Sequence, residues 1–178
     1  MLVEIMSLAD KTAVITGCSR GIGLSIADLL AQHGARIVAN SRNHTELEAA
    51  TSQIVDCLYV PGDVTNPKQA ENLINKAIEY HGSVDILICN VGSGASVPPG
   101  KENLEEWHRM FALNFYSAIN VIESAKPILK AGASIVCISS ICGSESIPGA
   151  PITYSTAKAA LNSYVKSISR YFGKLGIR

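Results

Sequence analysis

The chain has 178 residues, 47% of them hydrophobic and 17% charged, which is typical of one globular domain with a sizeable core and not of a disordered chain. Fifteen basic residues balance fifteen acidic ones, so the charge does not favour a nucleic acid or an anionic membrane surface as partner. Because no apolar run approaches the ~20 residues that span a bilayer, we expect no membrane segment.

The first six residues, Met1–Met6, lack the basic start and the long apolar core of a secretory signal. The cysteines form no C-x-x-C pair and the scattered histidines show no ligand spacing, so we expect structural thiols and no metal site. This use of cysteine fits a reducing compartment. A cytoplasmic location is therefore the default expectation.

The chain then opens on a predicted strand, a glycine-rich turn and a helix. Apolar residues at 12–15 precede the motif Thr16-Gly17-Cys18-Ser19-Arg20-Gly21-Ile22-Gly23, and apolar residues at helical spacing follow it. Glycines in such a turn allow positive φ and let phosphates come close to the backbone, while the helix start offers free N–H groups to a pyrophosphate. Taken alone, the motif also fits a turn that needs glycine only for steric reasons.

Strand and helix patterns alternate through the rest of the chain. Further strands are predicted at 36–40, 57–60, 85–89 and 134–138. Capping-box spacing predicts a helix from Thr45, and Asn66 followed by Pro67 predicts another. Two long amphipathic helices are predicted at 102–130 and 153–175. This alternation predicts a single α/β domain over residues 1–178, a doubly wound, Rossmann-like parallel sheet with strand order 3-2-1-4-5.

Polar residues follow the predicted strands, at the edge of a parallel sheet where ligands bind. They are Ser41 and Arg42, Asp63, Asn90 and Gly92, and Ser139 and Ser140. Each of them alone also fits ordinary turn chemistry.

Tyr154 and Lys158 are harder to explain in that way. Residues four apart share one face of a helix, and an ammonium there lowers the pKa of a neighbouring phenol toward the range useful for acid–base catalysis. For an arbitrary Tyr-x-x-x-Lys, however, a surface pair is the commoner explanation. Here the pair comes shortly after Ser140, in the next predicted element, so all three side chains can reach one pocket.

Together these motifs resemble the classical short-chain dehydrogenase/reductase family. The family's Thr-Gly-x-x-x-Gly-x-Gly is found at Thr16–Gly23, its Asn-Ala-Gly as Asn90-Val91-Gly92, its mid-helix Asn at Asn114, and its Ser, Tyr and Lys at Ser140, Tyr154 and Lys158. The resemblance covers residues 8–178 in order, and jointly the motifs are highly specific. Ser139 competes with Ser140 for the active-site serine, but Ser-Ile-Cys-Gly at 140–143 matches the family at Ser140.

The resemblance implies hydride transfer between a nicotinamide and a carbonyl or carbinol carbon of a small molecule. Tyr154 would act as general acid and base, Lys158 would lower its pKa and bind the nicotinamide ribose, and Ser140 would polarise the substrate oxygen. Asn114 would bend its helix and hold a proton-relay water; the alternative is a satisfied core amide without a catalytic part. The residues that the resemblance assigns to the cofactor are Gly17, Ser19, Arg20, Gly21, Ile22, Gly23, Ser41, Arg42, Asp63, Val64, Asn90, Val91, Gly92, Tyr154 and Lys158.

The residues after the second strand indicate which cofactor is used. An NAD site places a carboxylate there to accept from the ribose 2′-OH. This chain has Ser41 and Arg42 instead, with Arg20 in the glycine turn, and guanidinium groups suit a 2′-phosphate. We therefore expect NADP(H) to be preferred over NAD(H); the alternative for Arg42 is a solvated turn residue.

Two departures from the family bear on function. Val91 replaces alanine, and the chain stops at Gly176-Ile177-Arg178, where family members enter a sixth strand, a substrate loop and a seventh strand. We expect the chain to be C-terminally incomplete, and the sequence leaves the substrate open.

Other functions and an assembly are also compatible with the resemblance. A truncated or non-catalytic dinucleotide-binding module is the main alternative. The spacing of the glycines disfavours an NAD-dependent nucleotide-sugar epimerase or dehydratase. The resemblance further implies a homodimer or homotetramer, formed through the two long helices.

Overall fold

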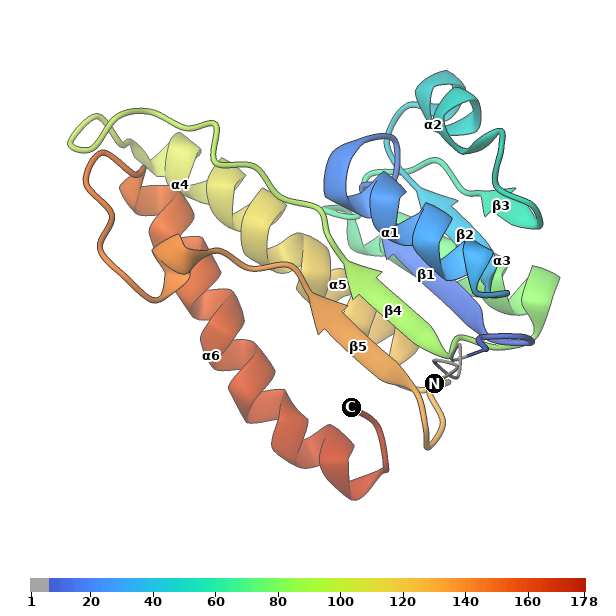
Figure 1. Cartoon of the computed structure of the whole chain (residues 1–178). Helices are drawn as coiled ribbons and strands as arrows, with labels where there is room; N and C mark the ends of the chain where they lie inside the picture. The colour runs from blue at the N-terminus through green and yellow to red at the C-terminus, as the bar shows by residue number, and fades with distance from the viewer. Residues whose placement is uncertain (1–6) are drawn as a thin grey trace, which may run out of the picture.

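A computed structural model describes residues 7–178, so the expectation for Met1–Met6 lies outside the described residues. The strands are β1 (Thr12–Thr16), β2 (Arg36–Asn40), β3 (Cys57–Tyr59), β4 (Ile86–Cys89) and β5 (Ser134–Cys137). They form one five-stranded parallel sheet in the order β3-β2-β1-β4-β5, with β1 at its centre (Figure 1). The strand order predicted from the sequence is confirmed.

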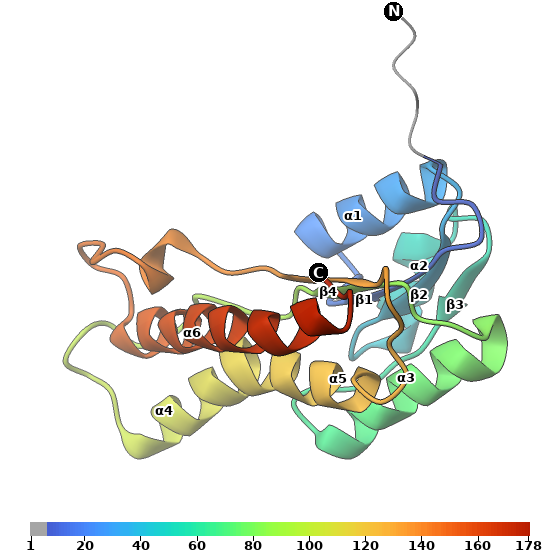
Figure 2. The same ribbon diagram turned by 90° about the horizontal axis from the view of Figure 1, so that it is seen from below.

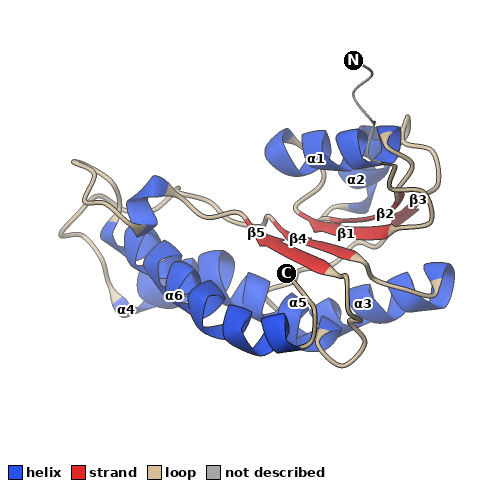
Figure 3. Ribbon diagram, turned by 60° about the horizontal axis from the view of Figure 1, so that its bottom comes forward, coloured by secondary structure: helices blue, strands red, loops and turns tan. Residues whose placement is uncertain are grey.

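Helices cover both faces of the sheet, as Figures 2 and 3 show. One face carries α1 (Gly21–Gln32) and α2 (His44–Thr51). The other carries α3 (Pro67–His81), α5 (Ser117–Ala125) and α6 (Ile152–Lys174), and α4 (Leu104–Phe111) extends beyond the sheet on this side. The doubly wound architecture is therefore confirmed. Among residues 7–178, no helix combines the length and the apolarity needed to cross a membrane.

The central strands show why both helical layers are needed. Residues along a strand point alternately to opposite faces. Ala13 and Ile15 of β1 pack on the side of α1 and α2, while Val14 packs on the side of α3, α5 and α6, and all three are fully buried. Leu87 and Ile88 of β4 divide between the two cores in the same way. Burial on both faces explains why these strands are continuous apolar runs.

The two helix starts predicted from caps have different outcomes. Asn66 accepts from two N–H groups of the first turn of α3, and Pro67 is its first residue, as predicted. The prediction that α2 begins at Thr45 is wrong. The cap is Asn43, whose side chain accepts from the N–H of Glu46 and donates to the Glu46 carboxylate, so Thr45 lies inside the first turn.

The helix predicted over 102–130 is interrupted. α4 ends at Phe111, a π-helical turn, η1 (Ala112–Tyr116), follows, and α5 begins at Ser117. Asn114 lies in the middle of η1, so the local distortion expected at this residue is present. Hydrophobic periodicity did not indicate the interruption, because apolar residues continue through it. The last predicted helix is confirmed as α6, with small shifts at both ends.

The segments after β4 and β5 position the candidate site. Both run out beyond the sheet and lie beside α4 and the start of α6 (Figure 1). At the opposite end of β5, Arg178 N–H donates to the carbonyl oxygen of Ala133 and Ile135 N–H donates to that of Arg178, at 3.0 and 2.7 Å. Arg178 thus bonds to the residues on either side of Ser134, which is the hydrogen-bond pattern of parallel strands. The amino end of β5 is therefore paired with the last residue of the chain.

Candidate active site

The glycines of the turn after β1 are required by backbone conformation or by close contacts. Gly17 and Gly21 have φ of +68° and +58°, in the left-handed region that favours glycine. A Cβ on Gly23 would lie 2.5 Å from the carbonyl oxygen of Gly17. Ser19 is half-buried and Ile22 is exposed on the surface of the turn. Close approach to the backbone, followed directly by the N-terminus of α1, fits the pyrophosphate of a dinucleotide.

Asn90, at the end of β4, holds this turn in place. Its Nδ2 donates to the carbonyl oxygens of Thr16 and Gly17, at 3.0 and 3.2 Å. The hydroxyl of Thr16 in turn accepts from the N–H groups of Asn90 and Val91, at 3.0 and 3.3 Å. The side chain of Asn90 thus positions the turn. Thr16 is absent from the predicted site residues, although a polar residue that ends an apolar strand is a signal that could have identified it.

Asn114 and Lys158 converge on Gly92. A Cβ on Gly92 would lie 2.9 Å from Asn114 Oδ1 and 3.0 Å from Lys158 Nζ. Asn114 Oδ1 accepts from the N–H of Ser93 at 2.9 Å, and Nδ2 donates to the carbonyl oxygens of Ser93 and Met110 at 3.1 and 3.2 Å. The buried amide is therefore well bonded, and it ties the π-helical turn to the segment after β4.

Tyr154 and Lys158 lie together on α6. Lys158 is 3% exposed, its Nζ donates to the carbonyl oxygen of Ile138 at 2.8 Å, and Nζ lies 6.0 Å from the centroid of the Tyr154 ring. Burial lowers the pKa of Lys158 below its ordinary 10.5. The half-buried ring of Tyr154 packs beside Gly94, where a Cβ would lie 3.8 Å from it. The phenol of Tyr154 and the buried ammonium of Lys158 thus lie beside the same stretch of backbone, residues 92–94.

Ser140 and Ser139 have different surroundings. Ser140 Oγ accepts from the N–H of Cys142 at 3.2 Å and caps the short 3₁₀ turn η2 (Ile141–Gly143). Ser139 Oγ donates to Asn162 Oδ1 at 2.6 Å and lines a separate cavity of about 670 Å³ between β5 and α6. Because the hydroxyl of Ser139 is engaged away from Tyr154, this geometry favours Ser140, whose catalytic role stays a prediction.

The residues predicted to bind the adenosine half follow β2 and β3. Ser41 is buried and its hydroxyl bonds to nearby backbone, whereas Arg42 and Arg20 are exposed. Asp63 is half-buried and accepts a local backbone hydrogen bond. Val64 is buried in the core and its carbonyl oxygen accepts from Asn120 Nδ2 at 3.0 Å, so its contact with an adenine ring stays a prediction. The two arginines are thus exposed positive charges at this end.

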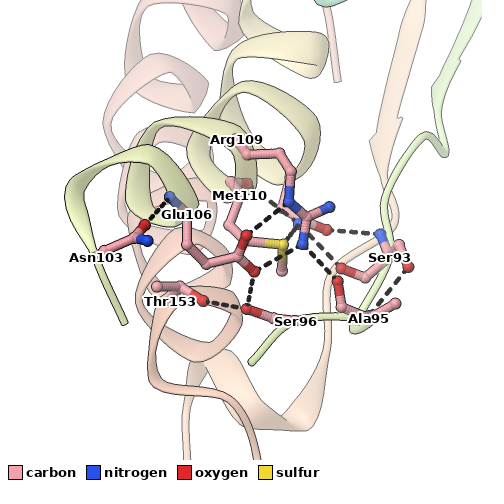
Figure 4. Close-up of polar contacts among 9 residues, drawn as sticks. Ser93, Ala95, Ser96, Asn103, Glu106, Arg109, Met110 and Thr153 are labelled. Carbon is pink, nitrogen blue, oxygen red and sulfur yellow. Dashed lines mark hydrogen bonds and ion pairs between the residues drawn. The ribbon is translucent and has the colours of Figure 1, made fainter. Parts of the chain in front are cut away.

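A polar network that the sequence did not reveal joins the segment after β4 to α4 and α6 (Figure 4). Arg109 Nε and Nη2 donate to the Glu106 carboxylate at 2.7 Å each, and Nη2 also donates to the carbonyl oxygen of Ala95 at 2.8 Å. The hydroxyl of Ser96 bonds to both Glu106 and Thr153. The i,i+3 spacing of Glu106 and Arg109 was a usable signal, but Ser96 and Thr153 are far apart in sequence and gave none.

A family model described as short chain dehydrogenase matches residues 11–178 of this chain. The chain is 36% identical over 179 residues to a tropinone reductase homolog of Arabidopsis thaliana, with 97% of this chain and 67% of that protein covered. It is 31% identical over 175 residues to an uncharacterized oxidoreductase of Staphylococcus aureus, with 96% and 75% covered.

Solved structures give the same likeness. A dehydrogenase/reductase from Sinorhizobium meliloti aligns with a TM-score of 0.91 at 33% identity, over 96% of this chain and 70% of that one. A short chain dehydrogenase from Burkholderia cenocepacia in complex with NADP aligns with a TM-score of 0.90 at 26% identity, over 96% and 71%. A 7α-hydroxysteroid dehydrogenase complexed with NADH aligns with a TM-score of 0.91 at 27% identity, over 97% and 69%.

Replacing Gly23 by Ala is expected to destabilise the protein, because the new Cβ would lie 2.5 Å from a backbone oxygen and 2.6 Å from Asn90 Nδ2. Forcing this contact open should cost about 1–3 kcal/mol, or several degrees in the midpoint of thermal unfolding. The control is Gly173→Ala in α6, where a Cβ meets nothing within 4 Å and should slightly stabilise the helix. Equal midpoints for the two variants would contradict the expectation.

Replacing Lys158 by Met is expected to raise the midpoint of thermal unfolding, because burial makes the folded state disfavour the ammonium. The gain in stability should be complete below the lowered pKa of Lys158 in the folded protein. It should shrink as pH rises toward 10.5, because the buried lysine then releases its proton and no longer destabilises the folded state. Thermal unfolding at pH 7 and pH 10 measures both effects. Lys174→Met, at an exposed position on the same helix, is the control. A variant less stable than wild type at pH 7 would show the expectation to be wrong.

Proposed function

The chain belongs to the short chain dehydrogenase family, and from this premise we propose that it is an NADP(H)-dependent oxidoreductase that interconverts a carbonyl and an alcohol. The observation that carries the proposal is the convergence of Asn114 and Lys158 on Gly92, with the Tyr154 ring beside Gly94. Tyr154 and Lys158, the proposed acid–base pair, thus lie beside residues 92–94. This segment follows Asn90, whose side-chain amide holds the glycine turn. The bound dinucleotide would supply or accept the hydride.

Tyr154 would exchange the proton with the substrate oxygen, donating it in reduction and removing it in oxidation. The buried ammonium of Lys158 favours a developing phenolate, because opposite charges attract strongly where water is excluded. Ser140, at the end of β5, would hydrogen-bond the same oxygen and polarise the carbonyl. Its hydroxyl can donate while its oxygen still accepts from Cys142.

Asn114 supports this arrangement mainly by position. Its amide already bonds Ser93 and Met110, which matches the alternative of a satisfied core amide. Oδ1 keeps a second lone pair on the side that it shares with Lys158 at Gly92. We propose that a water bonded there relays protons between Lys158 and solvent.

The proposed cofactor is NADP(H), held by the glycine turn and by Arg20 and Arg42. Both arginines are exposed, and Ser41 and Arg42 stand directly after β2 where an NAD site places a carboxylate, so no acidic side chain at these positions would repel a 2′-phosphate. A similar structure was solved with NADP and another with NADH, so the likeness alone does not choose between them. The choice rests on the two arginines.

Assembly and location belong to the same proposal. A homodimer or homotetramer would form through the outer faces of α4, η1, α5 and α6. Three aromatic residues on these helices could contribute to such an interface. Tyr116 is 51% exposed, whereas Phe115 and Tyr164 are partly buried and pack on each other with ring centroids 6.3 Å apart. A cytoplasmic location is proposed because all five cysteines are free thiols.

Replacing Tyr154 by Phe removes the phenolic proton and keeps the ring. NADPH oxidation with any accepted carbonyl compound should fall at least ~100-fold, while NADPH binding, followed by fluorescence titration, stays unchanged. Tyr171→Phe, an exposed tyrosine on the same helix, should match the wild type. Unchanged turnover in Tyr154→Phe would remove this residue from the mechanism. NADPH binding without turnover of any compound by the wild type would favour the non-catalytic module.

Replacing Arg42 by Ala should raise KM for NADPH about tenfold and leave KM for NADH unchanged, because a charge-assisted bond to a 2′-phosphate is lost. Arg170→Ala, at an exposed position on α6, controls for the loss of charge. Steady-state kinetics with both cofactors measure the effect. A wild type that prefers NADH would contradict the cofactor proposal.

A further inference from the structure

The segment Ser93–Ser96, shortly after β4, is held by side chains from three other elements, η1, α4 and α6 (Figure 4). The Asn114 amide bonds the backbone of Ser93, and Arg109 donates to the carbonyl oxygen of Ala95. Farther along, the hydroxyl of Ser96 bonds to Glu106 on α4 and to Thr153 on α6. A loop of this kind is ordinarily mobile, so side-chain hydrogen bonds to three of its four residues call for an explanation.

The donors and acceptors of this network can be assigned. Arg109 holds Glu106 with two hydrogen bonds of 2.7 Å and, together with Ser96, lowers the pKa of Glu106 to about 2. The carboxylate is therefore ionised at neutral pH and can only accept. Ser96 must then donate its single proton to Glu106, so it accepts from the hydroxyl of Thr153 at 2.8 Å. The order is Thr153 to Ser96 to Glu106, with one orientation for each hydroxyl.

The network ends beside the candidate catalytic tyrosine. Thr153 is fully buried and immediately precedes Tyr154 in the first turn of α6. That helix begins after Pro151, which gives it no side-chain cap, so its first turn lacks the usual local support. On the other side, Gly94 of the same held segment lies against the Tyr154 ring. The network thus reaches Tyr154 from two sides. Thr153 precedes it in the chain, and Gly94 of the held segment lies against its ring.

We propose that Glu106, Arg109, Ser96 and Thr153 are positioning residues for Tyr154, acting as a clamp between the segment Ser93–Ser96 and the first turn of α6. The clamp deepens the proposed function and rests on it. It fixes the direction of the phenol, and a displaced phenol slows proton transfer without altering the glycine turn and the two arginines that would hold the phosphates of the dinucleotide. The clamp residues take no part in the proton transfer itself.

Kinetics of matched variants test the clamp. Thr153→Val and Ser96→Ala should each lower kcat about tenfold with KM for NADPH unchanged, because the phenol loses its fixed direction. Thr153→Ser keeps the hydroxyl and should recover most of kcat. The double variant of Ser96→Ala and Thr153→Val should be no slower than either single variant, since both break the same chain of bonds. Glu79→Gln, which removes an exposed i,i+3 ion pair with Lys76 on α3, should leave kcat unchanged.

Hydrogen exchange gives a readout that does not depend on turnover. In Glu106→Gln the amides of residues 152–156 should exchange faster, together with those of 93–96, whereas Glu79→Gln should match the wild type. Wild-type kcat in Thr153→Val and Ser96→Ala beside an inactive Tyr154→Phe would overturn the clamp and leave the proposed function standing. Faster exchange confined to residues 93–96 would also overturn it, because the network would then brace the loop alone. Full turnover of Tyr154→Phe would instead overturn the proposed function.

Discussion

The side-chain amide of Asn90 is the contact on which both halves of the candidate site depend. It donates to two carbonyl oxygens of the glycine turn, and the backbone N–H of Asn90 donates to the hydroxyl of Thr16. Two residues later the same segment reaches Gly92, beside Lys158. Since β1 and β4 are neighbours in the sheet, one short stretch of backbone after β4 contacts both the glycine turn and Lys158 of α6. A side chain at Gly23 would collide with this amide, which explains the need for glycine there.

The site is also where the chain departs from the most stable choices. Lys158 is buried against a single carbonyl oxygen, α6 begins without a side-chain cap, and α4 gives way to a π-helical turn. Each feature costs stability locally, and all three lie around Tyr154. Departures of this kind are expected to gather at functional sites, because chemistry needs groups held where folding alone would not place them. The apolar cores on either side of the sheet supply the compensation.

Local patterns predicted most of the fold and brought the candidate site residues to notice. Alternating strand and helix periods predicted the sheet, and the Asn66-Pro67 pair marked a helix start, because these signals act between chain neighbours. The spacing of Tyr154 and Lys158 was likewise readable from one helix. The cap at Asn43 was missed because two nearby positions, Asn43 and Thr45, both carry cap-like residues. The bonds from Ser96 to Glu106 and Thr153 join distant parts of the chain, and no local pattern encodes them.

The π-helical turn also has a consequence for the rotational phase of the helix that contains it. Each residue of an α-helix turns the next by about 100°, so the extra residue accommodated in η1 offsets α4 from α5 by about that angle. With this offset, α5 presents Val121 and Ile122 to the sheet while α4 presents Glu106 and Arg109 to the polar segment after β4. A continuous α-helix of the same sequence would turn the residues of α4 by about 100° relative to those of α5, and would not present both sets to these surroundings. The single inserted residue thus acts as a phase shift that lets one length of chain be core at one end and wall of the site at the other.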